Sequence, residues 1–205
     1  MYKGHSSIEK RLYDFCADIS PSPHTIVDLG AHRGDGYKQL RQMYPNAVIH
    51  LVEPMQDCIS SIMDAVEGDK LAFVHPCAIG RDETTMMIKS FSSDERQSSN
   101  FYSDRGGLYG KPELVPVKVM THSFLPDKID LAKINIEAGE FELLETDFFD
   151  RVESFVMEAH NNLIPGKTWV DVVKSLEQKF DIVTTGNLNY KYCFVLGVKN
   201  RSLSG

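Results

Sequence analysis

The sequence predicts a doubly wound α/β sheet that ends in an antiparallel hairpin. Short apolar runs rich in β-branched residues alternate with segments in which apolar residues recur at helical intervals, as in parallel strands joined by helices. A glycine-rich turn separates the first run from the helix that follows it, and two final strand-like runs flank the turn sequence GNLNYK. Right-handed crossovers bring the carboxyl ends of such strands to one edge, where we expect the ligand to bind.

The stretch 25–54 has the pattern of a strand, a glycine turn, a helix and a second strand. The apolar run at 26–29 stops at Gly30, Gly34 and Gly36 follow, and the second apolar run ends in Glu53. Glycines let a ligand approach the backbone, and the helix start offers unpaired N–H groups to an anion. An acid that closes the second strand is placed to accept hydrogen bonds from a ribose diol. The unit therefore predicts nucleotide-type binding, with a purely structural turn as the alternative.

The glycine spacing, D-L-G-A-H-R-G-D-G, differs from the G-x-G-x-x-G fingerprint of dinucleotide sites. An acid ahead of the glycines suits a ligand with a cationic group, and S-adenosylmethionine combines an ammonium, a carboxylate, a sulfonium and a ribose. We therefore expect Glu53 to hold the ribose of S-adenosylmethionine. The methionine moiety is expected to lie against Asp28, Gly30, Ala31 and Gly34.

The elements around this unit follow ordinary helix and strand signals. Ser6 and Glu9 have the spacing of a capping box, which predicts a helix that ends before the prolines at 21 and 23. The apolar run at 71–79 predicts the third strand. Cys77 and Ala78 lie near its carboxyl end, and we expect them to flank the adenine.

The middle of the chain predicts two more strands and a long polar segment between them. The runs 84–91 and 114–120 are typical of strands, and Pro116 makes the second an edge candidate because proline cannot donate a ladder hydrogen bond. The segment 92–110 is rich in Ser, Asp, Gly and Asn, with aromatic residues interspersed. Loops of this length are usually functional or disordered, so we interpret the segment as a mobile substrate lid, with plain disorder as the alternative.

The second half predicts a strand at 130–136, a helix at 138–146 and a strand at 155–159. Thr168 is expected to cap the helix that follows. Several of the predicted strands end in polar residues that should converge on one crevice. These residues are Asp28, Glu53, Asn135, Glu137, Glu158 and His160.

The composition, with 42% hydrophobic and 25% charged residues, is that of an ordinary globular protein. We expect one domain over 1–205, with an N-terminal helix and linker at 1–23 and the catalytic core at 24–205. The net charge of −7 argues against nucleic acid or an anionic membrane as the main partner, with a local basic patch as the alternative, and we expect neither as a partner. No apolar run approaches the ~20 residues that span a bilayer, and no signal-peptide core is present. Four scattered cysteines indicate neither a zinc site nor disulfides, so we expect a cytoplasmic protein with reduced thiols.

Two parts of the sequence together resemble a known family. VDLGAHRGDG followed by HLVEP is similar to the first two motifs of class I S-adenosylmethionine-dependent methyltransferases. DLAKINIEAGEFELLE resembles the hallmark D-L-I-K-I-D-V-E-G-A-E-x-E-V-L of the FkbM-type methyltransferases, and VMEAHNN resembles the strand that follows it in that family. The resemblance implies a Rossmann-like seven-stranded sheet with one reversed strand and S-adenosylmethionine as the cofactor. It also implies methyl transfer to oxygen, and we expect the acceptor to be a hydroxyl of a small molecule or carbohydrate.

The sequence departs from the family pattern at three places. Asn135 replaces the usual aspartate, Ala138 and Gly139 invert the usual Gly-Ala, and His32 replaces a common asparagine. The missing carboxylate argues against a metal or a strong base at Asn135, which we assign to cofactor contact. The departures also motivate a second hypothesis, a non-catalytic protein that keeps the cofactor pocket as a binding module. A nucleotide-dependent oxidoreductase is a third hypothesis, which the glycine spacing disfavours.

The expected catalytic residues follow from the chemistry of methyl transfer to an alcohol. The sulfonium is already activated, so the alignment of nucleophile, methyl and sulfur supplies much of the rate. An alcohol must also lose its proton, so a general base helps. His160 is the first candidate because imidazole titrates near neutrality, with a structural histidine at a strand end as the alternative. Glu137 is the second candidate, as base or substrate orienter. No metal is required, although Glu137, Glu140 and His160 are ligand types that could bind one.

Overall fold

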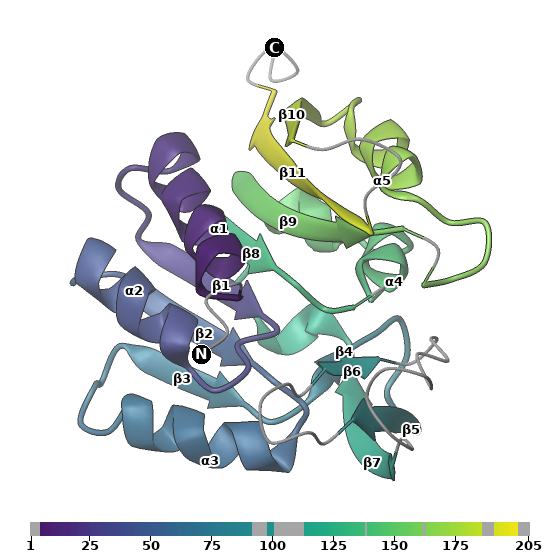
Figure 1. Ribbon diagram of the computed structural model, residues 1–205. Coiled ribbons are helices and arrows are strands. Elements are labelled where there is room, and N and C mark those ends of the chain that lie inside the picture. Colours follow the sequence, from purple (N-terminus) through teal and green to yellow (C-terminus); the bar gives the residue numbers. More distant parts are fainter. Residues whose placement is uncertain are drawn as a thin grey trace.

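The computed structural model describes residues 5–91, 98–100, 113–137, 139–161, 163–185 and 191–200 (Figure 1). For residues 5–10, 89–91 and 98–100 it describes the backbone alone. The helices are α1 (His5–Ile19), α2 (Asp35–Met43), α3 (Gln56–Ala65), α4 (Glu140–Leu144) and α5 (Trp169–Leu176), with 3₁₀ turns η1 (His122–Phe124) and η2 (Phe148–Arg151).

The strands form two sheets. The larger contains β1 (Thr25–Leu29), β2 (Val48–Val52), β3 (Ala72–His75), β8 (Leu131–Ile134), β9 (Ser154–His160), β10 (Phe180–Thr185) and β11 (Tyr192–Lys199). The smaller contains β4 (Ala78–Ile79), β5 (Thr84–Phe91), β6 (Ser98–Asn100) and β7 (Glu113–Met120).

The seven-stranded sheet has the order β10-β11-β9-β8-β1-β2-β3. Its strands are parallel except β11, which runs antiparallel to both β9 and β10. This confirms the predicted doubly wound sheet with one reversed strand and the C-terminal hairpin. Because the chain moves outward from β1 to β3 and then returns to β8 on the other side of β1, the order reverses between β1 and β8. A crevice at the carboxyl ends of β1 and β8 is the standard ligand position in such sheets.

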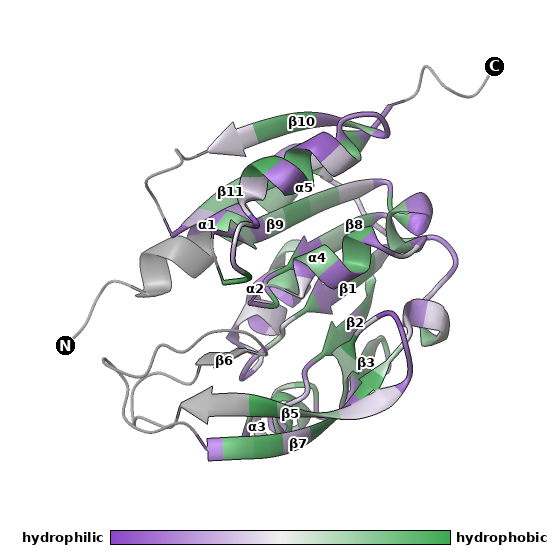
Figure 2. Cartoon of the chain, turned by 90° about the vertical axis from the view of Figure 1, so that its right-hand side faces the viewer, coloured by the Kyte–Doolittle hydropathy of each residue, from purple (hydrophilic) through white to green (hydrophobic). Residues whose placement is uncertain are grey.

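Each face of the large sheet is buried by a different set of helices. Helices α1, α2 and α3 lie on one face, and α4 and α5 lie on the other (Figure 1). Strands covered on both faces need to be apolar along most of their length. Figure 2 shows this for β9, whose seven residues are all buried. The two polar residues at its carboxyl end, Glu158 and His160, are therefore exceptions that need partners.

The predicted third strand, 71–79, is wrong as one element. It is interrupted at Pro76, which has no N–H to donate to a strand ladder. The part before it is β3, at the edge of the large sheet beside β2, and the part after it is β4, which pairs with β7 in the small sheet. The four-stranded sheet, whose order is β4-β7-β5-β6, was not predicted.

The edge prediction for β7 holds for only part of the strand. Strand β7 has β5 on one side and β4 on the other, but β4 pairs only with Val119 and Met120. Pro116, opposite Met87 of β5, therefore lies where β7 has no second neighbour among the described residues. Of the predicted lid at 92–110, Ser98–Asn100 form β6 and the rest lies outside the described residues.

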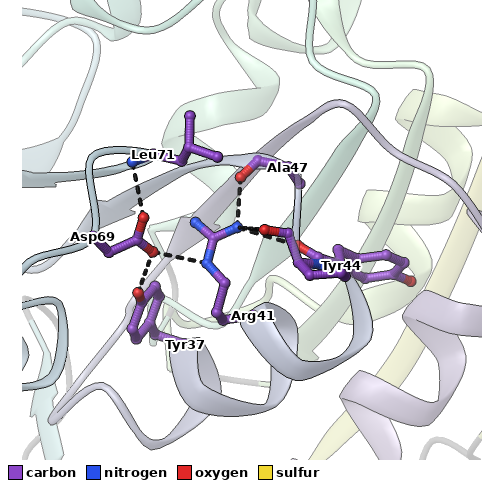
Figure 3. A network of polar contacts seen from close by, with 7 residues as sticks. Tyr37, Arg41, Tyr44, Ala47, Asp69 and Leu71 are labelled. Atoms are coloured by element: carbon purple, nitrogen blue, oxygen red, sulfur yellow. Dashed lines mark hydrogen bonds and ion pairs between the residues drawn. The ribbon is translucent and has the colours of Figure 1, made fainter.

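A polar network fixes the carboxyl end of α2 to the chain just before β3 (Figure 3). Arg41 Nε donates to Asp69 Oδ2 at 2.8 Å, and Tyr37 OH donates to the same oxygen. Arg41 also donates to the carbonyl oxygens of Tyr44 and Ala47, at 3.1 and 2.8 Å. The network thus links α2 and the loop after it to the segment between α3 and β3. Within the described part of the chain, no helix is long and apolar enough to cross a membrane.

Candidate functional site

The turn after β1 is held tightly between the two strands that flank β1. Gly30 and Gly34 have φ values of 81° and 82°, in the left-handed region that favours glycine. The N–H groups of Gly30 and Ala31 both donate to Val52 O of β2, at 3.0 and 3.2 Å. On the other side, a Cβ on Gly30 would lie 2.0 Å from Asn135 O, after β8. Gly30 is therefore required both by its backbone angle and by this close approach.

Asp28 is fully buried beneath this turn and is paired inside the protein. Its Oδ1 lies 2.9 Å from Nζ of Lys133, and the same ammonium donates to Gly30 O at 2.9 Å. Lys133 was not predicted as a site residue. The feature of the sequence that could have identified it is the presence of a lysine inside the otherwise apolar run 131–134. The buried pair attaches the glycine turn to β8.

Glu53 follows β2 and faces the same turn. Its side chain accepts hydrogen bonds from the backbone N–H of His32, at 3.0 Å, and of Met55, at 2.9 Å. Burial raises the pKa of Glu53 to about 7, although these two hydrogen bonds and Lys133 oppose the shift. Each carboxylate oxygen still has a second lone pair, so the group can accept hydrogen bonds from a vicinal diol.

Cys77 and Ala78 lie in two different apolar clusters, and only that of Ala78 includes Met55, which donates to Glu53. Cys77 is 2% exposed and belongs to the apolar core on the α4 side of the sheet. Burial raises the pKa of its thiol to about 11, so the thiol stays protonated near neutral pH. Ala78 packs in a separate apolar cluster with Met55 and Cys58. Their assignment to an adenine stays a prediction.

The carboxyl ends of β8 and β9 bring several predicted residues together. Asn135 N–H donates to Leu29 O at 2.9 Å, and its side-chain amide donates to Glu158 Oε2 at 3.1 Å. Glu137 has a φ of 46°, which is uncommon for a residue with a side chain. Strained backbone of this kind tends to occur at functional sites.

His160 lies at the centre of three carboxylates, which we call the carboxylate cluster, Glu137, Glu140 and Glu158. Its Nδ1 is 3.1 Å from Glu140 Oε1, and its Nε2 is 3.6 Å from both Glu137 Oε2 and Glu158 Oε1. Glu140 is fully buried, whereas the Glu137 side chain is 24% exposed. The structure thus confirms that these strand ends meet, and it adds Glu140, which the sequence suggested as a possible metal ligand.

The charge state of His160 differs from the sequence-based expectation. Burial lowers the pKa of His160, but the carboxylate cluster overcomes this effect and raises the pKa to about 9. The imidazole is then protonated near neutral pH and has no free lone pair with which to accept a proton. The expectation that this histidine titrates near neutrality is therefore corrected by its three acidic neighbours. Burial also raises the pKa of Glu158, which His160 partly offsets.

No group of three or more His, Cys, Asp or Glu residues among those described has an arrangement that could hold a metal ion. The four cysteines are all buried free thiols.

Solved structures with a similar fold include several methyltransferases. A putative methyltransferase from Streptococcus mutans in complex with SAH matches with a TM-score of 0.56 and 10% identity over 97% of this chain and 99% of that one. A putative rRNA-methylase from Clostridium thermocellum matches with a TM-score of 0.58 and 9% identity over 93% and 94% of the two chains. The fibrillarin/Nop5p complex matches with a TM-score of 0.54 and 14% identity over 86% and 73%.

These comparisons overturn one prediction made from net charge. The expectation that nucleic acid is excluded as a partner is wrong, because proteins described as rRNA methylases share this fold. The physical reason is that a net charge of −7 describes the whole chain and does not exclude a surface of suitable local charge. No protein-family model matches the chain, and no curated protein sequence matches it. At 9–14% identity, the structural matches identify the Rossmann-like fold seen in these methyltransferases.

Proposed function

We propose that this protein is an S-adenosylmethionine-dependent methyltransferase that acts on a hydroxyl oxygen. The main observation is the position of Glu53, a buried carboxylate after β2 that accepts the His32 N–H of the glycine turn. Glu53 is thereby held beside the glycine turn, next to the point at which the strand order reverses, where it would accept hydrogen bonds from a ribose diol. A structure of the same fold that was solved with SAH supports the choice of cofactor.

The residues that would hold the cofactor divide into direct and supporting groups. Glu53 would accept the ribose hydroxyls, and the turn at 30–34 would lie along the methionine moiety. Asp28 has no exposed surface, so its role in this proposal is to hold Lys133 and, through it, the carbonyl of Gly30. Asn135 would contribute from the opposite strand end, where its amide is already oriented by Glu158.

The carboxylate cluster would act on the methyl acceptor. When bound, S-adenosylmethionine supplies a methyl group on a sulfonium, and the methyl–sulfur bond breaks as the methyl–oxygen bond forms. The acceptor hydroxyl must give up its proton, and Glu137 is the best-placed group because it is the most exposed carboxylate in the cluster. His160, as an imidazolium 3.6 Å from Glu137, would orient that carboxylate and stabilise its charge.

Calorimetric titration with S-adenosylmethionine, SAH and NAD tests the cofactor assignment. We expect binding of the first two and none of NAD, and NAD binding without S-adenosylmethionine binding would instead favour an oxidoreductase. Candidate acceptors, including sugars, small phenols and RNA, are then screened, and methyl transfer is measured as the release of SAH. Cofactor binding without methylation of any acceptor would favour the non-catalytic binding module.

A further inference from the structure

Glu140 is a buried acid with an unusual double contact to one residue. It is the first residue of α4 and has no exposed surface. Its Oε1 accepts the backbone N–H of His160 at 2.8 Å and lies 3.1 Å from the ring Nδ1 of the same residue. One carboxylate oxygen therefore fixes both the end of β9 and the orientation of the imidazole.

The contact decides which way the other ring nitrogen faces. With Nδ1 directed at Glu140, Nε2 is directed to the opposite side of the ring, where it lies 3.6 Å from Glu137 and from Glu158. If the ring were flipped, Nδ1 would no longer face Glu140. The shortest of the ring's three contacts with carboxylates would then be lost. Glu140 thus determines the approach of His160 to the partly exposed carboxylate of Glu137.

The energetics also require a charged partner for Glu140. Its second oxygen, Oε2, is buried with no hydrogen-bond partner among the described residues. An ionised carboxylate in such a place is costly unless a cation lies against it, and His160 is the group in contact. The other titratable groups around the ring are Glu137, Glu158, Lys133 of β8, which acts on Glu158, and Tyr192 of β11, which is opposite His160 in the strand register.

We propose that Glu140 is a positioning residue for methyl transfer, which holds the protonated ring of His160 so that Nε2 orients Glu137 toward the acceptor hydroxyl. The inference rests on the proposed function, and it assigns Glu140 no contact with cofactor or acceptor. Glu140 acts entirely through His160.

The first test follows the titration of the His160 ring by NMR in the wild type, in Glu140→Gln and in Glu145→Gln. Glu145 is the matched control because it ends the same helix, is 62% exposed and pairs with Arg81 at 3.6 Å. In the wild type the pKa of His160 should lie well above its usual value of 6.5. Glu140→Gln should lower it by ~1–3 pH units, and Glu145→Gln should leave it unchanged. An equal pKa in Glu140→Gln and wild type would overturn the proposal.

The wild-type titration decides the matter even where Glu140→Gln does not fold. A His160 that titrates at or below its usual value in the wild type would mean that Glu140 does not hold a protonated ring. Glu140→Asp provides a second variant, because it keeps the negative charge and should retain most of the elevated pKa.

The second test separates positioning from binding. With an acceptor from the screen, Glu140→Gln should lower kcat by ~10²-fold through misplacement, leave S-adenosylmethionine affinity unchanged in calorimetry, and shift the pH profile with the His160 titration. Glu140→Asp should recover part of the rate. Unchanged kcat and pH profile in Glu140→Gln would contradict the proposal. Failure of the wild type to bind S-adenosylmethionine would instead contradict the proposed function, independently of the NMR result.

Discussion

Asp28 and Lys133 are register partners on the adjacent parallel strands β1 and β8, and their side chains form a buried ion pair with 2.9 Å between Oδ1 and Nζ. Breaking a buried pair by removing one partner leaves an uncompensated charge and typically costs ~3–5 kcal/mol. We expect Lys133→Met to lower the free energy of unfolding by that amount, measured by urea denaturation. The combination Asp28→Leu with Lys133→Met should recover part of the loss, since it leaves no buried charge.

Lys128→Met is the control for this pair. Lys128 is 72% exposed and lies 3.9 Å from Asp130, so its removal should change stability by at most about 1 kcal/mol. If Lys133→Met were no more destabilising than Lys128→Met, the buried pair would not be holding the glycine turn.

Gly30→Ala and Gly68→Ala form a matched pair of substitutions. Both glycines have left-handed backbone angles, with φ of 81° and 78°, but only Gly30 has a backbone atom within 4 Å of the added Cβ. Gly68→Ala should cost ~1–2 kcal/mol from the backbone angle alone. Gly30→Ala should cost more, on the order of 3 kcal/mol or greater, because Asn135 O lies 2.0 Å from the new atom. Thermal unfolding of both variants measures the difference, and equal losses would rule out the close approach.

Glu53 should give cofactor binding a characteristic pH dependence. Its pKa is raised to about 7, so the fully ionised carboxylate that best accepts a diol is present only above that value. Binding of methylthioadenosine, which has the ribose but no titrating amino group, should strengthen as pH rises through 7. Glu53→Gln should remove this dependence, and Glu53→Ala should weaken binding by ~1–3 kcal/mol in calorimetry. If the affinity changed with pH equally in Glu53→Gln and wild type, Glu53 would not be the group that binds the ribose.

The raised pKa of Glu53 also predicts that, in the absence of ligand, stability changes with pH in the opposite direction. Its folded pKa of about 7 lies above the ordinary value of 4.5, so the folded state binds more protons than the unfolded state between these values. Stability should therefore fall as pH rises through this window. Glu53→Gln should flatten that part of the profile, which denaturation at several pH values would reveal.

Asp69 should stabilise the fold in a manner that is lost in acid. Burial opposes the shift, but hydrogen bonds from Tyr37, Leu71 and Arg41 lower the pKa of Asp69 below its ordinary 3.8 (Figure 3). The contribution is therefore present above that value and disappears as pH falls through the lower, folded pKa. Asp69→Asn should cost ~1–3 kcal/mol near neutral pH and much less in acid. Asp82→Asn, at a 74% exposed side chain, should change little at either pH.

The elements that were predicted correctly are those determined by short stretches of sequence. Thr168 forms a capping box with Asp171, and the runs around GNLNYK form the antiparallel pair β10–β11. In both cases the signal lies within a few residues. Pro76 was also a local signal, in this case for a strand break. The apolar residues on both sides of it nevertheless led to the prediction of one continuous strand.

The part of the candidate site that was missed depends on the pairing of distant strands. Lys133 becomes a site residue only because register sets it opposite Asp28. Glu140 becomes one because α4 begins beside the end of β9, and this contact changes the charge state expected for His160. No spacing within the sequence encodes these contacts, since they follow from strand order and from crossover geometry.

The chain leaves the large sheet at β3, its outermost strand, and re-enters it at β8, next to β1. The described strands between these two points pair only with one another, in the four-stranded sheet. This stretch can therefore lengthen, shorten or be replaced during evolution without disrupting the hydrogen bonds between strands of the seven-stranded sheet. A chimera that exchanges residues 78–120 for the equivalent stretch of another protein of this fold should keep the Asp28–Lys133 pair intact. It should keep the position of Glu53 only where the new stretch also packs against Met55 and Cys58. The fold thereby allows the small sheet to change while the strands that carry Asp28 and Lys133 are conserved.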